Sequence, residues 1–383
     1  MRRRSFLAVG CACTVMAAAR AACAQTWAAP ARFARPALST DEGGLWSLMD
    51  REETRLRRSP FALRDPDLQA YVQSIACRLA GDHCPDLRVH LVRTPMFNAS
   101  MAPNGMMQVW TGLLLRMENE AQLAAVLGHE IGHYVERHTL ERLRDVKVRS
   151  AFAQFLGLFG WPGSVGRIAL VATELAFSRD QERAADRIGV TLMRNAGYDA
   201  AEAARVWGNL LLEIEARDED DIARALPLLA THPAPEERRE TLGQLANAQP
   251  GGAAYAERWR EKVKPHMLEW LMEEVKRGRH GQSLALLNRM IERSPTSAEA
   301  FFARGEIFRM RAQRNDLDLA LGDYERAVRL GGEPPQTHRG LGLIYRQKHE
   351  LVSAKTCFER YLELAPAAAD AMLIRNYLEA AGT

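Results

Sequence analysis

The chain has 383 residues, of which 47% are apolar and 26% charged, a composition typical of a globular protein and not of a disordered or fibrous one. This length allows two or three domains that each bury a core. No run of eighteen apolar residues occurs, so the sequence predicts no helix that crosses a membrane.

The N-terminus, residues 1–24, has the layout of a cleavable export signal. Three arginines come first, an apolar stretch of small residues follows, and a small-residue cleavage site precedes Gln25. The arginines fit a twin-arginine signal and a general secretory signal equally well. A lipoprotein signal fits less well, since neither Cys11 nor Cys23 has a branched apolar residue at the lipobox position. We expect a protein exported to the periplasm.

The mature chain that remains differs in charge and in cysteine content. Cleavage removes four arginines and no acidic residue, so the formal net charge falls from +3 to −1, which gives no reason to expect a nucleic-acid partner. Cys77 and Cys84 are close enough in sequence for a local disulfide in an oxidising compartment, or they are two separate buried thiols. Cys357 has no evident partner.

The region 38–246 is predicted to be mainly helical with a small sheet. The segment 87–92 alternates in the manner of a strand, and 106–110 is a second strand candidate after the turn signal Pro103-Asn104-Gly105. Between them, residues 98–101 fit a short edge strand. The sequence therefore predicts an α+β region in which helices dominate.

Two long helices are expected in this region. The first runs from about residue 120 to 148, with apolar residues at helical spacing, and the second from about 165 to 195. Between them the apolar segment 152–161 is followed by Pro162 and Gly163. It fits a loop or a short helical hairpin, and its role as a lid or as a membrane contact stays open.

Residues 247–258 contain the densest group of turn formers and are predicted to be a linker. The helical residues 259–383 then show a period near thirty-four, which is typical of tetratricopeptide repeats. Generic helical hairpins remain the alternative. The matching positions are Leu341, Gly342, Tyr345, Ala354, Phe358 and Pro366, then Gly305, Phe308, Ala320, Tyr324 and Ala327, and more weakly Leu271, Ser283, Leu287, Met290 and Pro295.

The sequence His129-Glu130-Ile131-Gly132-His133 lies inside the first long helix. Residues four apart share one helix face, so both imidazoles can reach one metal ion with Glu130 beside it. A chance match is expected in roughly one or two of a hundred chains of this size. A buried histidine pair without a metal would need other partners for its ring nitrogens.

Catalytic zinc usually takes three protein ligands, so a third is needed. Glu182 on the second helix is the candidate, and Asp186 one turn later can accept a hydrogen bond from a ligating histidine. The alternative for this charged segment is a solvated helix face.

The pair of motifs, His129-Glu130-x-x-His133 and Glu182-x-x-x-Asp186, resembles the zinc metallopeptidases related to the CAAX prenyl protease. The signal and the repeats are similar to the periplasmic branch of that family. The resemblance implies a mainly α fold of the zincin type with a small edge sheet, followed by an α-solenoid of tetratricopeptide repeats. It also implies one Zn²⁺ per chain.

Further assignments come from the resemblance alone. Asn98, Ala99 and Ser100 look like the edge strand onto which an extended peptide adds. His232 resembles a histidine that approaches the zinc, and Arg238 an arginine that faces the reacting carbonyl. The sequence Ser100-Met101-Ala102 and the small number of repeats depart from the family pattern, which leaves substrate preference and partners open.

The resulting hypothesis is a periplasmic zinc endopeptidase in which Glu130 is the base. Its expected substrates are unfolded or misassembled envelope proteins, and the repeats are expected to dock on the outer-membrane β-barrel assembly machinery. The alternative is mainly a repeat-based chaperone or docking module with latent proteolysis.

Overall fold

The computed structural model describes residues 27–144, 150, 176–217, 232 and 235–381. The predicted export signal, the segment 152–161 and residues 165–175 of the second predicted helix lie outside these residues. Residues 176–178 of that prediction are not helical, and the helix begins at Arg179 because Ser178 caps it in an extended conformation. The described chain is mainly helical with a small sheet. Its elements are α1 (Asp41–Arg58), α2 (Pro66–Ala80), η1 (Gly81–Asp86), β1 (Arg88–Val92), β2 (Ala99–Met101), β3 (Met106–Trp110), α3 (Thr111–Arg116), α4 (Glu120–Val135), α5 (His138–Leu143), α8 (Arg179–Asn195), α9 (Ala201–Glu215), α11 (Pro235–Ala248), α12 (Ala256–Val263), η3 (Lys264–His266), α13 (Met267–Lys276), α14 (His280–Arg293), α15 (Ala298–Arg311), α16 (Asp316–Leu330), α17 (Gln336–Gln347), α18 (Leu351–Leu364) and α19 (Ala371–Ala381).

The sheet has the strand order β1-β3-β2, with β1 parallel and β2 antiparallel to β3. In the turn between β2 and β3, Gly105 has a φ of 85°, which favours glycine. Asn104 Oδ1 accepts a hydrogen bond from the N–H of Met106 (3.2 Å). Among the described residues β2 pairs only with β3, so the predicted edge strand does lie at an edge.

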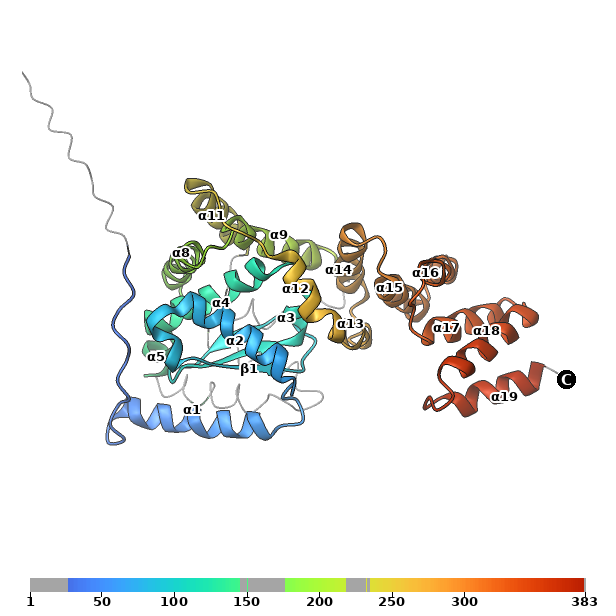
Figure 1. The fold of residues 1–383 in the computed structure, drawn as a ribbon, viewed down its shortest axis with the longest axis horizontal. Helices are drawn as coiled ribbons and strands as arrows, with labels where there is room; N and C mark the ends of the chain where they lie inside the picture. Colours follow the sequence, from blue (N-terminus) through green and yellow to red (C-terminus); the bar gives the residue numbers. More distant parts are fainter. Residues whose placement is uncertain (1–26, 145–149, 151–175, 218–231, 233–234, 382–383) are drawn as a thin grey trace, which may run out of the picture.

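Helices α4 and α8 pack with their backbones in contact (Figure 1). A Cβ on Gly132 would lie 2.9 Å from the carbonyl oxygen of Ala185, and one on Gly189 would lie 3.0 Å from the amide nitrogen of His129. Gly128 faces the same part of α8, with 3.2 Å from its hypothetical Cβ to the carbonyl oxygen of Gly189. Glycine at these positions therefore sets the distance between the two helices that carry the predicted ligands.

The helix predicted over 120–148 is interrupted. α4 ends at Val135, and α5 begins at His138. Between them Arg137 takes the left-handed conformation, with a φ of 59°. A right-handed helix cannot continue through such a residue, so the chain changes direction here. Hydrophobic periodicity alone did not indicate this break.

Cys77 and Cys84 are joined by a disulfide. The bond ties the end of α2 to η1, the turn that leads into β1. Cys357 in α18 is a free, half-buried thiol.

The apolar core continues past the boundary predicted at Ala246. Trp259 of α12 and Trp270 of α13 belong to the same cluster of buried side chains as the core residues of α2 and α4. The N–H of Ala121 also donates to the carbonyl of Ala254 (3.1 Å). Residues in and after the predicted linker are therefore packed on the first region.

A buried ionic cluster, called here the junction cluster, lies where these parts meet. It consists of Arg116 of α3, Glu213 of α9 and Glu274 of α13, each at most 5% exposed. Arg116 Nε donates to Glu213 (2.7 Å) and its Nη2 to Glu274 (3.0 Å). Arg277 pairs with Glu274 at 2.6 Å and Arg289 with Glu213 at 3.1 Å.

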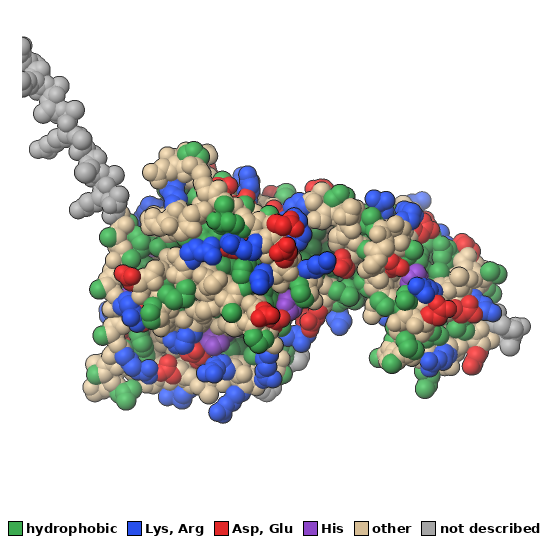
Figure 2. Space-filling view, in the orientation of Figure 1, with side chains coloured by type: hydrophobic (Ala, Val, Ile, Leu, Met, Phe, Trp, Pro, Cys, Tyr) green, Lys and Arg blue, Asp and Glu red, His purple; other side chains and the backbone are tan. Residues whose placement is uncertain are grey.

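The helices from α15 to α19 extend away from the rest as an arm (Figure 1). A Cβ on Gly305 would lie 2.7 Å from Tyr324 Cε1, and one on Gly340 would lie 2.6 Å from Tyr324 Cζ, so glycine allows this ring to fit between α15 and α17. Acidic and basic side chains are interspersed over the face seen in Figure 2. In the described part of the chain, no helix has the length and apolar character needed to cross a membrane.

Candidate metallopeptidase site

Four potential metal ligands meet where α4 packs on α8, and we call them the ligand cluster: His129, His133, Glu182 and His232. His133 Nε2 lies 3.3 Å and His129 Nε2 3.5 Å from the Glu182 carboxylate. His232 Nδ1 lies 2.8 Å from Glu182 Oε1. One ligand atom from each residue lies within 4.8 Å of the others, and all four side chains are buried.

The local sequence explains why Glu182 points into this site. Ser178 Oγ accepts a hydrogen bond from the N–H of Gln181 (3.2 Å), and Gln181 Oε1 accepts one from the N–H of Ser178 (3.1 Å). This capping box fixes the first turn of α8. Glu182 follows in that turn and faces α4.

The protonation states of the cluster suit metal binding. Burial lowers the pKa of His129 to about 4 and that of His133 well below its usual range, so both imidazoles are neutral, as ligation requires. Burial opposes ionisation of Glu182, but His232 and His129 outweigh it and hold the pKa of Glu182 well below its usual range. For His232, burial is likewise outweighed, and Glu182 raises its pKa.

Asp186 and Arg238 lie behind the ligands. Asp186 Oδ1 is 2.9 Å from His129 Nδ1, the contact expected from the helix spacing, and it leaves His129 Nε2 for a metal. Arg238 donates from Nε to Asp186 (2.9 Å) and pairs through Nη1 with Glu182 (3.0 Å). Its guanidinium lies over the ring of Trp207, 3.9 Å from the centroid. A role for Arg238 toward a reacting carbonyl stays a prediction.

His138 and Phe177 also belong to the site, and the sequence analysis missed both. His138 Nδ1 lies 3.0 Å from His133 Nδ1, so it can fix the orientation of His133 as Asp186 does that of His129. Phe177 stacks on the His133 ring at 3.9 Å between centroids. The spacing of metal-ligand motifs along one helix does not indicate His138. This residue reaches His133 only because the chain turns at Arg137, which is in the left-handed conformation.

Glu130 lies beside the ligands on the side of β2. It is 3% exposed, and its Oε1 has no hydrogen-bond partner among the described residues. Burial raises the pKa of Glu130 to about 7, against the opposing effect of His232. The N–H of Met101 in β2 donates to this carboxylate. A carboxyl group with such a pKa can accept and return a proton near neutral pH.

The charge of the site fits a divalent cation. The carboxylates of Glu182 and Asp186 face the single guanidinium of Arg238, which leaves one negative charge in excess when the imidazoles are neutral. Glu130 adds a further negative charge when it is ionised. Buried unbalanced charge is costly, and a divalent cation would balance it. Glu130 Oε1 is buried without a hydrogen-bond partner among the described residues, and His232 Nε2 lies 3.5 Å from it. Imidazole and carboxylate are suitable donors.

The edge strand presents only some of its backbone groups to a peptide. Asn98 accepts from the N–H of Trp110, and the antiparallel register gives Ser100 the same orientation toward β3. Ala99 and Met101, which alternate with them, therefore direct their N–H and C=O groups to the free edge. Of the three predicted residues, Ala99 is the one whose backbone suits strand addition. The side chain of Asn98 is buried.

Two imidazoles from one helix, a carboxylate from a second helix and a proton-accepting glutamate beside them define a metallopeptidase. The sequence profile of peptidase family M48 matches residues 62–246. The match covers just under half of the chain, and this region is similar to the peptidases of family M48.

Named relatives agree with this class. The mitochondrial metalloendopeptidase OMA1 of Arabidopsis thaliana is 34% identical over 157 residues, which cover 41% of this chain and 31% of the relative. The β-barrel assembly-enhancing protease of Escherichia coli is 30% identical over 210 residues, 50% of this chain and 42% of the relative. The putative β-barrel assembly-enhancing protease of Vibrio cholerae is 29% identical over 198 residues, with 48% and 40% covered. The chain spans less than half the length of these relatives.

Proposed function

We propose that this chain is a zinc-dependent endopeptidase of the cell envelope that degrades misfolded or stalled outer-membrane proteins. The observation that carries the proposal is the buried arrangement of His129, His133 and Glu182 with Glu130 beside them. Two histidines and one carboxylate are a common ligand set of catalytic zinc. The printed names of two relatives, β-barrel assembly-enhancing proteases, support this class of substrate.

The proposed chemistry assigns a role to each group. When bound, a zinc ion would supply Lewis acidity toward the scissile carbonyl. Glu130 would take a proton from the attacking water and later give it to the leaving amine, and its pKa of about 7 suits both directions. The backbone of Ala99 would hold the peptide as an added strand. Asp186 would keep His129 in the tautomer and orientation that bind the metal.

We further propose that His232 makes the resting enzyme latent. Its Nδ1 lies 3.2 Å from His129 Nε2 as well as 2.8 Å from Glu182, so it stands among the other ligand atoms. As a fourth ligand it would occupy the position that a catalytic site leaves open for water or substrate. Activity would then require His232 to move away.

The location and domain organisation belong to the same proposal. Residues 1–24 would direct export to the periplasm by the general secretory or the twin-arginine route. Residues 38–246 would form the peptidase domain, 247–258 the linker and 259–383 the tetratricopeptide repeats. The packing of Trp259 and Trp270 in the first core supports a fixed attachment of the repeats to the peptidase.

We propose that the repeats select clients or dock on the assembly machinery. Glycines packed against Tyr324 and Phe358 support the repeat assignment, since small residues let paired helices approach. The arm also exposes apolar side chains, with Val352 83% and Met372 73% exposed. Serine at both positions should weaken binding of an unfolded outer-membrane protein while casein cleavage is unchanged. Unchanged client binding would count against this role.

The central test is metal content together with casein cleavage, for the mature protein and for Glu130→Gln. We expect one zinc per chain in both proteins and a loss of about 10²- to 10⁴-fold in cleavage rate for Glu130→Gln. Zinc without cleavage in either protein would indicate latency and lead to His232→Ala. A protein that binds no zinc would overturn the site assignment.

A further inference from the structure

The N-terminal segment, residues 27–46, packs on the region that carries the ligand cluster. Up to residue 37 it forms neither helix nor strand and runs along the side of the molecule (Figure 1). Trp27 Nε1 donates to Glu136, the residue that follows α4 (3.2 Å). The carbonyl of Pro30 lies 2.8 Å from Nε2 of the buried His83 in η1. The segment is therefore held both at η1 and at the end of α4.

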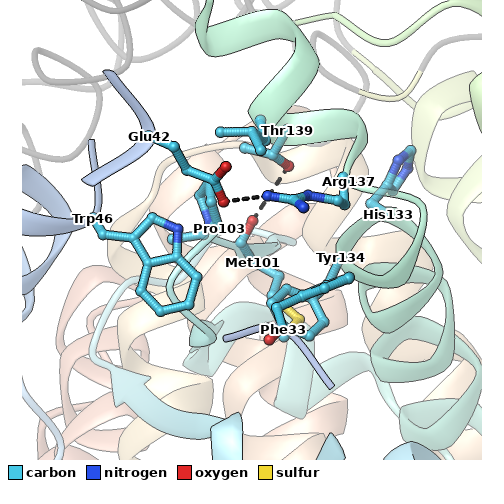
Figure 3. A pocket seen from close by; sticks show the side chains of 11 residues that line it. Phe33, Glu42, Trp46, Met101, Pro103, His133, Tyr134, Arg137 and Thr139 are labelled. Atoms are coloured by element: carbon cyan, nitrogen blue, oxygen red, sulfur yellow. Dashed lines mark hydrogen bonds and ion pairs between the residues drawn. The ribbon is translucent and has the colours of Figure 1, made fainter. Parts of the chain in front are cut away.

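The turn between α4 and α5 depends on Arg137, which is left-handed with a φ of 59°. This conformation is unfavourable for a residue with a side chain, and it persists where the surrounding structure determines it. The guanidinium of Arg137 pairs with Glu42 of α1 and lies over the Phe33 ring, 4.8 Å from its centroid (Figure 3). Phe33 in turn packs edge-on against Tyr134 of α4, with 5.2 Å between ring centroids. The N-terminal segment thus holds the side chain on which the turn depends.

The turn decides where His138 lies relative to the ligand His133. The two Nδ1 atoms are 3.0 Å apart, so one of them donates a hydrogen bond to the other. When His133 is the donor, its Nε2, which faces Glu182 at 3.3 Å, carries the lone pair that a metal needs. If Arg137 left the left-handed conformation, His138 would move away and the His133 ring would lose this partner.

We propose that Glu42 and Phe33 are positioning residues for the metal site. They hold Arg137 in its left-handed conformation, and Arg137 in turn keeps His138 against His133. The inference rests on the proposed zinc-dependent function. It goes beyond that function because the N-terminal segment precedes the stretch that matches peptidase family M48. A segment that only packed on the surface would change the free energy of unfolding but not the zinc affinity of the folded protein.

The first test compares the zinc affinities of Arg137→Ala and Arg137→Gly, measured by competition with a chromophoric chelator at equal helix content. Both variants lose the contacts with Glu42 and Phe33, but glycine adopts a positive φ without the steric cost that alanine has. We expect the alanine variant to bind zinc about 5- to 10-fold more weakly than the glycine variant. Binding by the alanine variant that is as tight or tighter would overturn the inference, because the conformation of the turn would then not matter.

The second test removes the two positioning side chains with the double variant Glu42→Ala and Phe33→Leu. We expect its zinc affinity to be about 3- to 10-fold lower than that of the wild type. In a protein that also carries His138→Ala, the same two changes should have no further effect, because the turn then has no contact left to the ligands. Glu257→Ala, at an exposed ion pair of α12, is the control and should leave zinc affinity unchanged. A loss that is absent, or equal in both backgrounds, would overturn the inference.

A readout on the metal-free protein keeps the inference testable even if no zinc binds. With isotope-labelled histidines, the NMR shifts of the imidazole nitrogens report which nitrogen of each ring carries the proton. We expect one fixed tautomer each for His133 and His138 in the wild type and averaged shifts in the double variant. Unchanged shifts in that variant would overturn the inference. A wild type that binds no zinc contradicts the proposed function, and the NMR comparison then decides this inference alone. Zinc binding without cleavage contradicts only the endopeptidase activity.

Discussion

The ligand cluster and the junction cluster are both buried groups of charged side chains, but their charges are balanced differently. In the junction cluster the two carboxylates, Glu213 and Glu274, are matched by the guanidinium groups of Arg116, Arg277 and Arg289. In the ligand cluster and its surroundings, carboxylates outnumber guanidinium groups. Buried charge by itself therefore does not indicate a functional site. A buried excess of carboxylates over guanidinium groups does, because that excess calls for a cation.

The largest expected effect tests the junction cluster. Arg116→Met leaves two buried carboxylates with fewer partners and should lower the free energy of unfolding by about 3–5 kcal/mol, measured by urea denaturation. Zinc content at low urea should stay at one per chain, because Arg116 is not near the ligands. Arg260→Met, which removes a solvent-exposed ion pair with Glu257, is the control and should leave unfolding unchanged. A loss as small as that of the control would show that the junction cluster is not structural.

A smaller effect tests how the ligand cluster is supported. His138→Ala removes the partner of His133 Nδ1 and should weaken zinc binding about 10- to 100-fold, or roughly 1.4–2.8 kcal/mol. Competition with a chromophoric chelator measures the affinity without depending on proteolysis. His349→Ala, an exposed histidine in the arm, is the matched control. Equal zinc affinity in the two variants would remove His138 from the site.

The smallest effect concerns the fourth member of the ligand cluster. His232→Ala should raise casein cleavage severalfold, about 1 kcal/mol in the barrier, because the position that His232 occupies becomes open to substrate. Zinc should stay bound, since three ligands remain. The experiment compares initial rates of the wild type and the variant at equal zinc content. No gain in rate with zinc retained would argue against latency.

The sequence was sufficient to predict those parts of the site in which the residues concerned lie on a single helix. Helix periodicity put His129 and His133 on one face, and the same spacing put Glu182 and Asp186 on one face of the next helix. The strands at 87–92 and 106–110 followed from alternation and from a turn signal. The edge strand expected at 98–101 is observed as Ala99–Met101. These features are local, so local rules describe them.

The remainder of the site depends on contacts between distant segments. His138 reaches His133 only because Arg137 adopts a left-handed conformation. The spacing of apolar residues in the sequence does not reveal such a conformation. Phe33 packs on Tyr134 at the end of α4, about a hundred residues away in sequence. Likewise, the composition of residues 247–258 indicated a linker but could not show that Trp259 packs in the first core.

The glycine contact between α4 and α8 has a consequence for how this protein can change. Gly128, Gly132 and Gly189 bind nothing, yet each holds the two ligand-bearing backbones at contact distance. An alanine at Gly132 would have to push α8 away, and Glu182 would move with it, away from His133. Mutational tolerance at these positions is therefore set by the metal-binding distances and not by helix propensity, which would favour alanine. The chemistry of the site is constrained by residues that take no part in it.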